Sequence, residues 1–127
     1  MKILLLTISL CLSLLTYSQA RNGYSLSEIL TEFQYEEVNT GYPDHQWVSV
    51  KLSLCTVVYN FDEDNICSST FIIPNTLEDI AYYTNKYDKE LRKISKGYWV
   101  QIAKNLNTYV EFLEDEKTGG FYFYWHP

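Results

Sequence analysis

Residues that could carry out catalysis or bind a metal ion are sparse in this sequence. Its two histidines, His45 and His126, lie far apart, and no Cys-x-x-Cys pattern occurs. Structural zinc sites are built from cysteine and histidine ligands at short, regular spacings, so the pattern predicts no metal centre and no cofactor. A small hydrolase that combines His45 or His126 with a carboxylate is an alternative, because such a site can be assembled from distant parts of a chain.

Two acidic clusters, residues 62–65 and 114–116, offer oxygen atoms to a cation such as calcium. A calcium-binding EF-hand loop needs glycine at its sixth position and glutamate at its twelfth, whereas Cys67 and Ile73 stand there. Asp and Asn also favour turns for local reasons, so we interpret both clusters as solvated turns. The sequence further lacks a nucleophile elbow, a phosphate-binding loop and a dinucleotide fingerprint. These absences favour a non-enzymatic function.

Cys55 and Cys67 could form a disulfide bond. Paired cysteines in a small domain are commonly bonded in an oxidising compartment. A tight turn at residues 62–65 would, however, place Cys55 opposite Ile72 instead of Cys67, so a bond would need a longer loop or a bulge. The sequence leaves the pairing open.

Aromatic side chains are the most unusual feature of the composition, with 12 Tyr, 6 Phe and 3 Trp in 127 residues. Alternation along a strand at residues 121–125 would separate Tyr122 and Tyr124 from the other rings of that run. Such rings could pack across strands and stabilise a sheet, or they could form a recognition surface. The candidate binding residues on this aromatic face are Trp47, Trp99, Tyr122 and Tyr124.

The first twenty residues have the features of a cleavable export signal. Lys2 precedes an apolar run at residues 3–15, which is too short to span a bilayer as a stable helix. Ser18 and Ala20 then occupy the small-residue positions that signal peptidase requires. We therefore expect cleavage after Ala20, a secreted or periplasmic single domain over residues 21–127, and no transmembrane segment after removal of the signal.

The charge of the chain is acidic, with a net value of −6 that becomes −7 if Lys2 is removed with the signal. A nucleic-acid partner is not expected, because such binding requires a basic surface that neutralises phosphates. A basic partner is favoured instead.

Two helices and five strands are predicted. Residues 25–34 form a short helix that starts with a capping box of Ser25 and Glu28, and residues 76–96 form a long helix that ends before Gly97. The predicted strands cover residues 46–61, 66–73, 98–103, 108–113 and 121–125.

Short turns between these strands favour antiparallel pairing, and an amphipathic helix must cover one face of the sheet. We therefore expect an α+β domain with an antiparallel sheet of about five strands, one long helix and one short helix, in the order α-β-β-α-β-β-β. No internal repeat is visible in the sequence.

The leading functional hypothesis is a secreted or periplasmic, non-enzymatic binding module, such as an inhibitor or adaptor. It would engage a protein or glycan through the aromatic sheet face, which acidic loops would border. Besides the hydrolase, the other alternative is an envelope structural protein that self-associates through the edge of the strand at residues 121–125. The sequence does not determine the oligomeric state.

Overall fold

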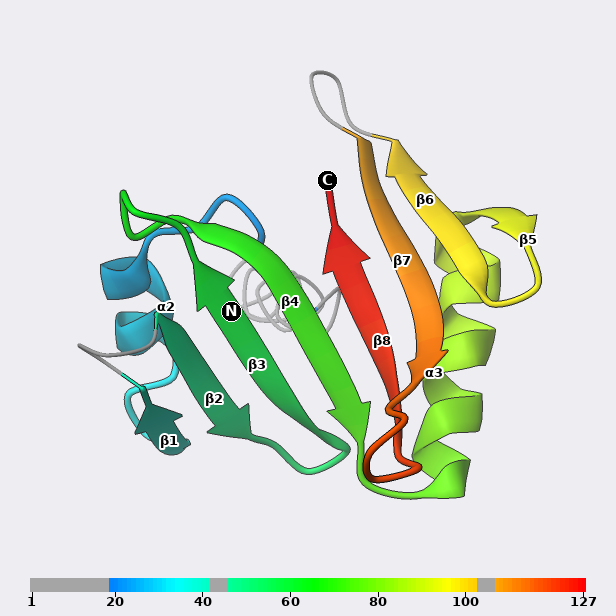
Figure 1. The fold of residues 1–127 in the computed structure, drawn as a ribbon, viewed down its shortest axis with the longest axis horizontal. Coiled ribbons are helices and arrows are strands. Elements are labelled where there is room, and N and C mark those ends of the chain that lie inside the picture. Colours follow the sequence, from blue (N-terminus) through cyan, green and yellow to red (C-terminus); the bar gives the residue numbers. More distant parts are fainter. Residues whose placement is uncertain (1–18, 42–45, 103–106) are drawn as a thin grey trace, which may run out of the picture.

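A computed structural model describes residues 19–41, 46–102 and 107–127. Within these residues the strands form one antiparallel, eight-stranded sheet in the order β1-β2-β3-β4-β8-β7-β6-β5 (Figure 1). The elements, in chain order, are α2 (Leu26–Glu32), β1 (Glu37–Thr40), β2 (Trp47–Lys51), β3 (Cys55–Phe61), β4 (Cys67–Pro74), α3 (Leu77–Glu90), β5 (Arg92–Ser95), β6 (Tyr98–Ile102), β7 (Asn107–Glu114) and β8 (Phe121–His126).

The described chain consists of two halves with the same arrangement. In each half a helix precedes four strands that pair consecutively, α2 with β1 to β4 and α3 with β5 to β8. The last strands of the two halves, β4 and β8, pair antiparallel at the centre of the sheet, where Phe71 lies opposite Tyr124. An approximate twofold axis normal to the sheet therefore relates the halves. This repeat lies in the order and pairing of the elements and is not visible in the sequence.

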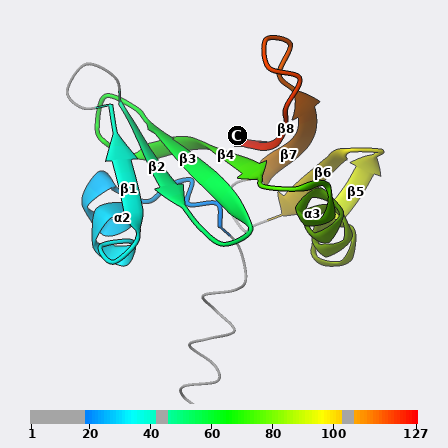
Figure 2. The ribbon, with the colours of Figure 1, turned by 90° about the horizontal axis from the view of Figure 1, so that it is seen from below.

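Both helices pack on the same face of the sheet, as Figure 2 shows. Phe33, next to α2, stacks on Tyr59 of β3, with ring centroids 5.9 Å apart. On the other side of the molecule, Tyr83 and Tyr87 of α3 contact Phe123 of β8 at 5.9 and 5.2 Å. Tyr59, Tyr83, Tyr87 and Phe123 belong to a single buried cluster, and Phe33 packs against it. The two halves therefore share one hydrophobic core.

The strand predicted at residues 46–61 is in fact two strands. The chain turns between β2 and β3, where the Leu52 amide donates a hydrogen bond to the Cys55 carbonyl at 2.9 Å. The inward-facing residues change from even positions such as Val50 to odd positions such as Val57. The turn reverses the chain and changes the inward-facing residues from even to odd positions. The interpretation of residues 46–61 as one long strand was therefore wrong.

Two short edge strands were also missed. Residues 37–40 form β1 beside β2, and the long helix ends at Glu90 instead of residue 96, so that Arg92–Ser95 forms β5. Gly97, at a φ of +72°, lies in the turn that follows β5 and does not cap the helix. β5 and β6 form an antiparallel hairpin. If the helix continued to residue 96, the backbone groups on this side of β6 would have no strand partner.

The prediction of about five strands in the order α-β-β-α-β-β-β is therefore wrong, although the α+β class is correct. The capping box of the first helix is confirmed. Ser25 Oγ accepts a hydrogen bond from the Glu28 amide, and Glu28 Oε1 accepts one from the Ser25 amide, each at 3.2 Å.

Candidate functional site

The sheet face opposite α2 and α3 carries a continuous group of aromatic side chains. Strand pairing places Phe71 of β4, Tyr124 of β8 and Tyr98 of β6 in one row across the sheet, with Glu111 of β7 between the two tyrosines. All of these side chains are half-buried. We call the rings that β4, β8, β7 and β6 carry on this face the aromatic patch, and it consists of Phe71, Tyr98, Tyr109, Tyr122, Tyr124 and His126.

Five rings of the aromatic patch stack in a series. The centroids of Tyr98 and Tyr109, and those of Tyr109 and His126, are 5.9 Å apart with interplanar angles of 21° and 27°. His126 to Tyr124 and Tyr124 to Phe71 are both 4.8 Å apart, at angles of 24° and 18°. Near-parallel rings at these distances are offset-stacked. Each ring of the series therefore turns a face toward a neighbouring ring, an arrangement that favours exposure of ring edges and tyrosine hydroxyls.

A histidine and a carboxylate meet within the aromatic patch. His126 Nε2 lies 2.9 Å from Glu111 Oε2, and the two side chains are 23% and 39% exposed. Their partial exposure suits contact with a ligand. Neither residue lines the hollow beside α2 that is described below. Neither lines the two further hollows, one over β5 to β7 and one on α3. The other histidine considered for a hydrolase, His45, lies outside the described residues.

The four candidate aromatic residues do not form one surface. Tyr122 and Tyr124 belong to the aromatic patch. Trp47 lies on the same sheet face, but it is on β2, and β3 and β4 separate it from β8. Its indole also packs over Gly41, where an added Cβ would collide with the ring.

Trp99 lies on the opposite face of the sheet and is only 1% exposed. Its indole Nε1 donates a hydrogen bond to Asp88 Oδ1 at 2.9 Å, and its ring packs against Tyr87 of α3. Because its strand partner Val110 faces the core, Trp99 must face the core too. Its inclusion in the candidate surface is corrected accordingly.

Several residues of this face were not predicted as site residues. Their alternation along each strand is visible in the sequence, since Tyr98 is two positions from Val100 and Tyr109 is two positions from Glu111. Alternation separates two faces of a strand but does not say which face the helices cover. The sequence analysis did not place the following residues on one surface: Phe71, Tyr98, Tyr109, Glu111 and His126.

The two described cysteines are buried free thiols. Cys55 begins β3 opposite Pro74, whereas Cys67 begins β4 opposite Phe61, so they lie at opposite ends of the hairpin. A disulfide requires Cα atoms within about 7 Å of each other. The Cys55–Cys67 bond that the sequence left open is not formed. Burial raises the pKa of both thiols, which makes them poor nucleophiles.

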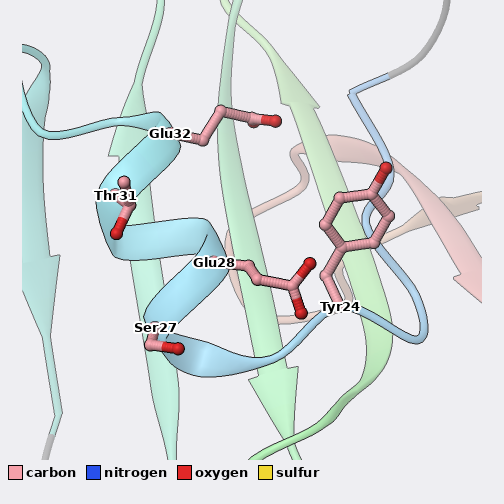
Figure 3. Close-up of a pocket in the computed structure, with 5 residues that line it drawn as sticks. All are labelled: Tyr24, Ser27, Glu28, Thr31 and Glu32. Atoms are coloured by element: carbon pink, nitrogen blue, oxygen red, sulfur yellow. The ribbon is translucent and has the colours of Figure 1, made fainter.

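A shallow hollow of about 420 Å³ lies beside α2. Its carboxylates already have structural partners, since Glu28 caps the helix at Ser25 and Glu32 accepts from Arg21 Nε at 3.0 Å. The hollow therefore offers little free chemistry. Its lining residues, shown in Figure 3, are Tyr24, Ser27, Glu28, Thr31 and Glu32.

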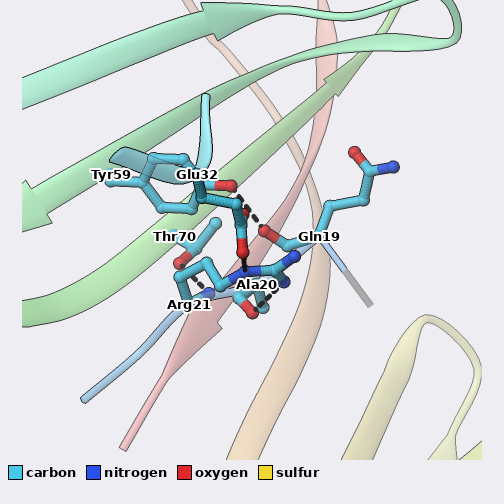
Figure 4. A network of polar contacts seen from close by, with 6 residues as sticks. All are labelled: Gln19, Ala20, Arg21, Glu32, Tyr59 and Thr70. Carbon is cyan, nitrogen blue, oxygen red and sulfur yellow. Dashed lines mark hydrogen bonds and ion pairs between the residues drawn. The ribbon is translucent and has the colours of Figure 1, made fainter. Parts of the chain in front are cut away.

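The segment before α2 is tied to the core by polar contacts (Figure 4). The Tyr59 hydroxyl donates to the Gln19 carbonyl at 2.7 Å, and Arg21 Nη1 donates to the Ala20 carbonyl at 2.9 Å. The Arg21 amide donates to Thr70 Oγ1 at 3.4 Å. The expected cleavage site between Ala20 and Arg21 thus lies in a segment that contacts the folded sheet.

The acidic clusters form turns. Asp62 Oδ1 accepts hydrogen bonds from the Asp64 and Ile66 amides at 2.9 and 3.0 Å. In the second cluster, Asp115 Oδ1 accepts a hydrogen bond from the Lys117 amide at 2.9 Å. This hydrogen bond lowers the pKa of Asp115 and keeps its carboxyl group charged. Across residues 19–41, 46–102 and 107–127, no group of three or more His, Cys, Asp or Glu side chains could hold a metal ion.

Comparison with protein-family models, curated proteins and solved structures finds no match for this chain. Of the helices within the described ranges, none has the length and apolar character needed to cross a membrane.

Proposed function

We propose that the protein is a secreted or periplasmic, non-enzymatic binding module that docks a protein partner through the aromatic patch. One observation carries the proposal, namely a continuous series of half-buried rings on the sheet face opposite both helices. Tyrosine supplies a large amphipathic contact area at low entropic cost and is enriched at the energetic centres of protein interfaces.

The stacking of the rings favours a protein over a glycan. A sugar packs its C–H groups against the open face of an aromatic ring, whereas Tyr109, Tyr124 and His126 each have ring neighbours on this surface. The ring edges and hydroxyls that remain suit the mixture of apolar and hydrogen-bonding groups on a protein surface.

Charge favours a basic partner. The chain carries a net charge of −6, and the connection between β7 and β8, which contains Asp115 and Glu116, rises from the sheet on the side away from the helices (Figure 2). Opposite charge accelerates the encounter of two proteins and disfavours wrong partners.

The two alternative functions receive less support. Self-association through the edge of the last strand is not available, because β8 lies between β4 and β7 and pairs with both. A hydrolase would use the pair of His126 and Glu111, which lies on an aromatic sheet face and lines none of the hollows described above.

Site-specific photocrosslinking tests the proposal. A benzophenone amino acid is introduced at Tyr124 in the native host, with the exposed Tyr82 of α3 as the matched control position. We expect a discrete protein adduct from position 124 and none from position 82. We also expect the double substitution Tyr122→Ser/Tyr124→Ser to abolish co-purification of the same partner.

An adduct from position 82 alone, or a partner retained by the double variant, would contradict docking through the patch. An adduct that a glycosidase removes would identify a glycan and overturn the choice of a protein.

A further inference from the structure

We propose that Glu111 anchors a basic side chain of the partner, arginine in preference to lysine, at the centre of the aromatic patch. This inference rests on the proposed function and specifies the chemistry that the surface recognises.

Glu111 occupies a central position in the pattern of rings. Strand pairing places it directly between Tyr98 of β6 and Tyr124 of β8. Tyr109 is two positions earlier on the same strand and lies opposite His126. Rings thus border the carboxylate on both neighbouring strands and along its own strand.

The carboxylate can accept a further donor. His126 Nε2 contacts Oε2 at 2.9 Å, which orients the group and leaves Oε1 for a ligand. The Glu111 side chain is 39% exposed, so a ligand can reach it. Partial enclosure by aromatic rings also lowers the local dielectric constant, which strengthens the attraction between the carboxylate and a cation relative to bulk water.

Arginine fits this environment better than lysine. A guanidinium group is planar, is more weakly hydrated than an ammonium group, and combines hydrogen bonding to a carboxylate with packing against aromatic rings. On the same face Arg92 of β5 lies opposite Val100 of β6 and lines a hollow together with Tyr109 of β7. The strand partners of Glu111 are instead Tyr98 and Tyr124, and the acidic connection after β7 adds negative charge beyond these rings.

Nuclear magnetic resonance with a defined probe tests the anchor without knowledge of the partner. The domain is titrated with Nα-acetyl-arginine methylamide, the corresponding lysine compound, and the uncharged citrulline analogue. We expect saturable shifts of the Tyr98 and Tyr124 ring resonances with arginine, weaker shifts with lysine and none with citrulline. Glu111→Gln should lower the affinity for the arginine probe about fivefold, as expected for loss of the charge at a partly exposed carboxylate.

Glu37→Gln is the matched control, because Glu37 is an exposed carboxylate at the far end of the same sheet, on β1 opposite Lys51. Equal shifts with arginine and citrulline, or equal losses in the two variants, would overturn the anchor. A photocrosslinked partner that binds the Glu111→Gln domain at full strength would also reject the anchor while leaving the docking surface intact. Unchanged amide spectra away from the patch would show that the variant is folded.

Discussion

At the scale of single residues, Cys55 and Cys67 illustrate how position decides chemistry. The Tyr83 hydroxyl donates a hydrogen bond to Cys55 Sγ at 3.1 Å, and Cys67 Sγ lies 3.3 Å from the Ser69 carbonyl. Both thiols are enclosed in the core and face separate partners. They act as small apolar side chains that complete the packing.

Thiol labelling of a chain that starts at Arg21 tests this role. Because burial raises the pKa of both thiols, the reactive thiolate is scarcer in the folded state than in the unfolded chain at about pH 8. We expect Ellman's reagent to react slowly with the native domain and to titrate both described thiols rapidly once guanidinium chloride unfolds it. Failure of the unfolded chain to react until a reductant is added would instead demonstrate a disulfide.

Gly41 is a second position where one atom matters. A Cβ there would overlap the Trp47 indole, so Gly41→Ala should displace the ring and destabilise the domain by about 1–3 kcal/mol, the usual cost of overpacking. Tryptophan fluorescence and urea unfolding measure the two effects. Gly120→Ala is the control, since its Cβ would meet the Thr118 hydroxyl at 3.3 Å. Equal behaviour of the two variants would show that the contact with Trp47 carries no constraint.

At the scale of elements, the segment before α2 holds the halves of the sheet together. Asn22 Nδ2 approaches the carbonyls of Ser68 on β4 and Trp125 on β8, at 3.4 and 3.3 Å. The Gly23 amide donates to the Cys67 carbonyl at 2.8 Å. If cleavage follows Ala20, we expect it to precede folding, because the peptide bond that is cut contacts the sheet in the folded chain.

A double-mutant cycle tests the contribution of the residues next to the expected cleavage site. Tyr59 is fully buried and donates to the Gln19 carbonyl. Starting the chain at Arg21 instead of Gln19 should therefore lower the free energy of unfolding by about 1–3 kcal/mol, the cost of an unsatisfied buried hydroxyl. Tyr59→Phe should remove most of this difference. Chemical denaturation of the two chain lengths, each with Tyr59 and with the Tyr59→Phe substitution, would measure it. Strictly additive effects of the truncation and the substitution would exclude the hydrogen bond as the cause.

At the scale of the whole molecule, the repeated halves depend on one another. They pair through three register positions of β4 and β8, but the core is continuous across them, as the contact between Tyr83 of α3 and Cys55 of β3 shows. A half of about 50 residues buries too little apolar surface to be stable alone. The approximate twofold arrangement is therefore one cooperative domain.

Equilibrium unfolding should consequently show a single transition. Trp47 reports on the first half, whereas Trp99 and Trp125 report on the second. In the Trp47→Phe variant, the tryptophan fluorescence reports only on the second half, whereas the far-ultraviolet circular dichroism reports on both halves. We expect the two signals to change at the same denaturant concentration. Separate midpoints for these two signals would mean that the halves unfold independently.

The sequence by itself determined the features that depend on neighbouring residues. The capping box of Ser25 and Glu28, the turn at Asp62 and the separation of Tyr122 from Phe123 follow from contacts or alternation within a few positions. The α+β class follows from the same local patterns.

Only the tertiary structure decided which residues meet across the sheet. It divided residues 46–61 into two strands, buried Trp99, separated Cys55 from Cys67 and brought Glu111 together with His126. The physical reason is that alternation defines two faces of a strand without labelling them, whereas strand pairing and helix packing determine which face is buried. The residues of the aromatic patch therefore lie in separate alternating segments of the sequence. They form one surface only when β4, β8, β7 and β6 pair.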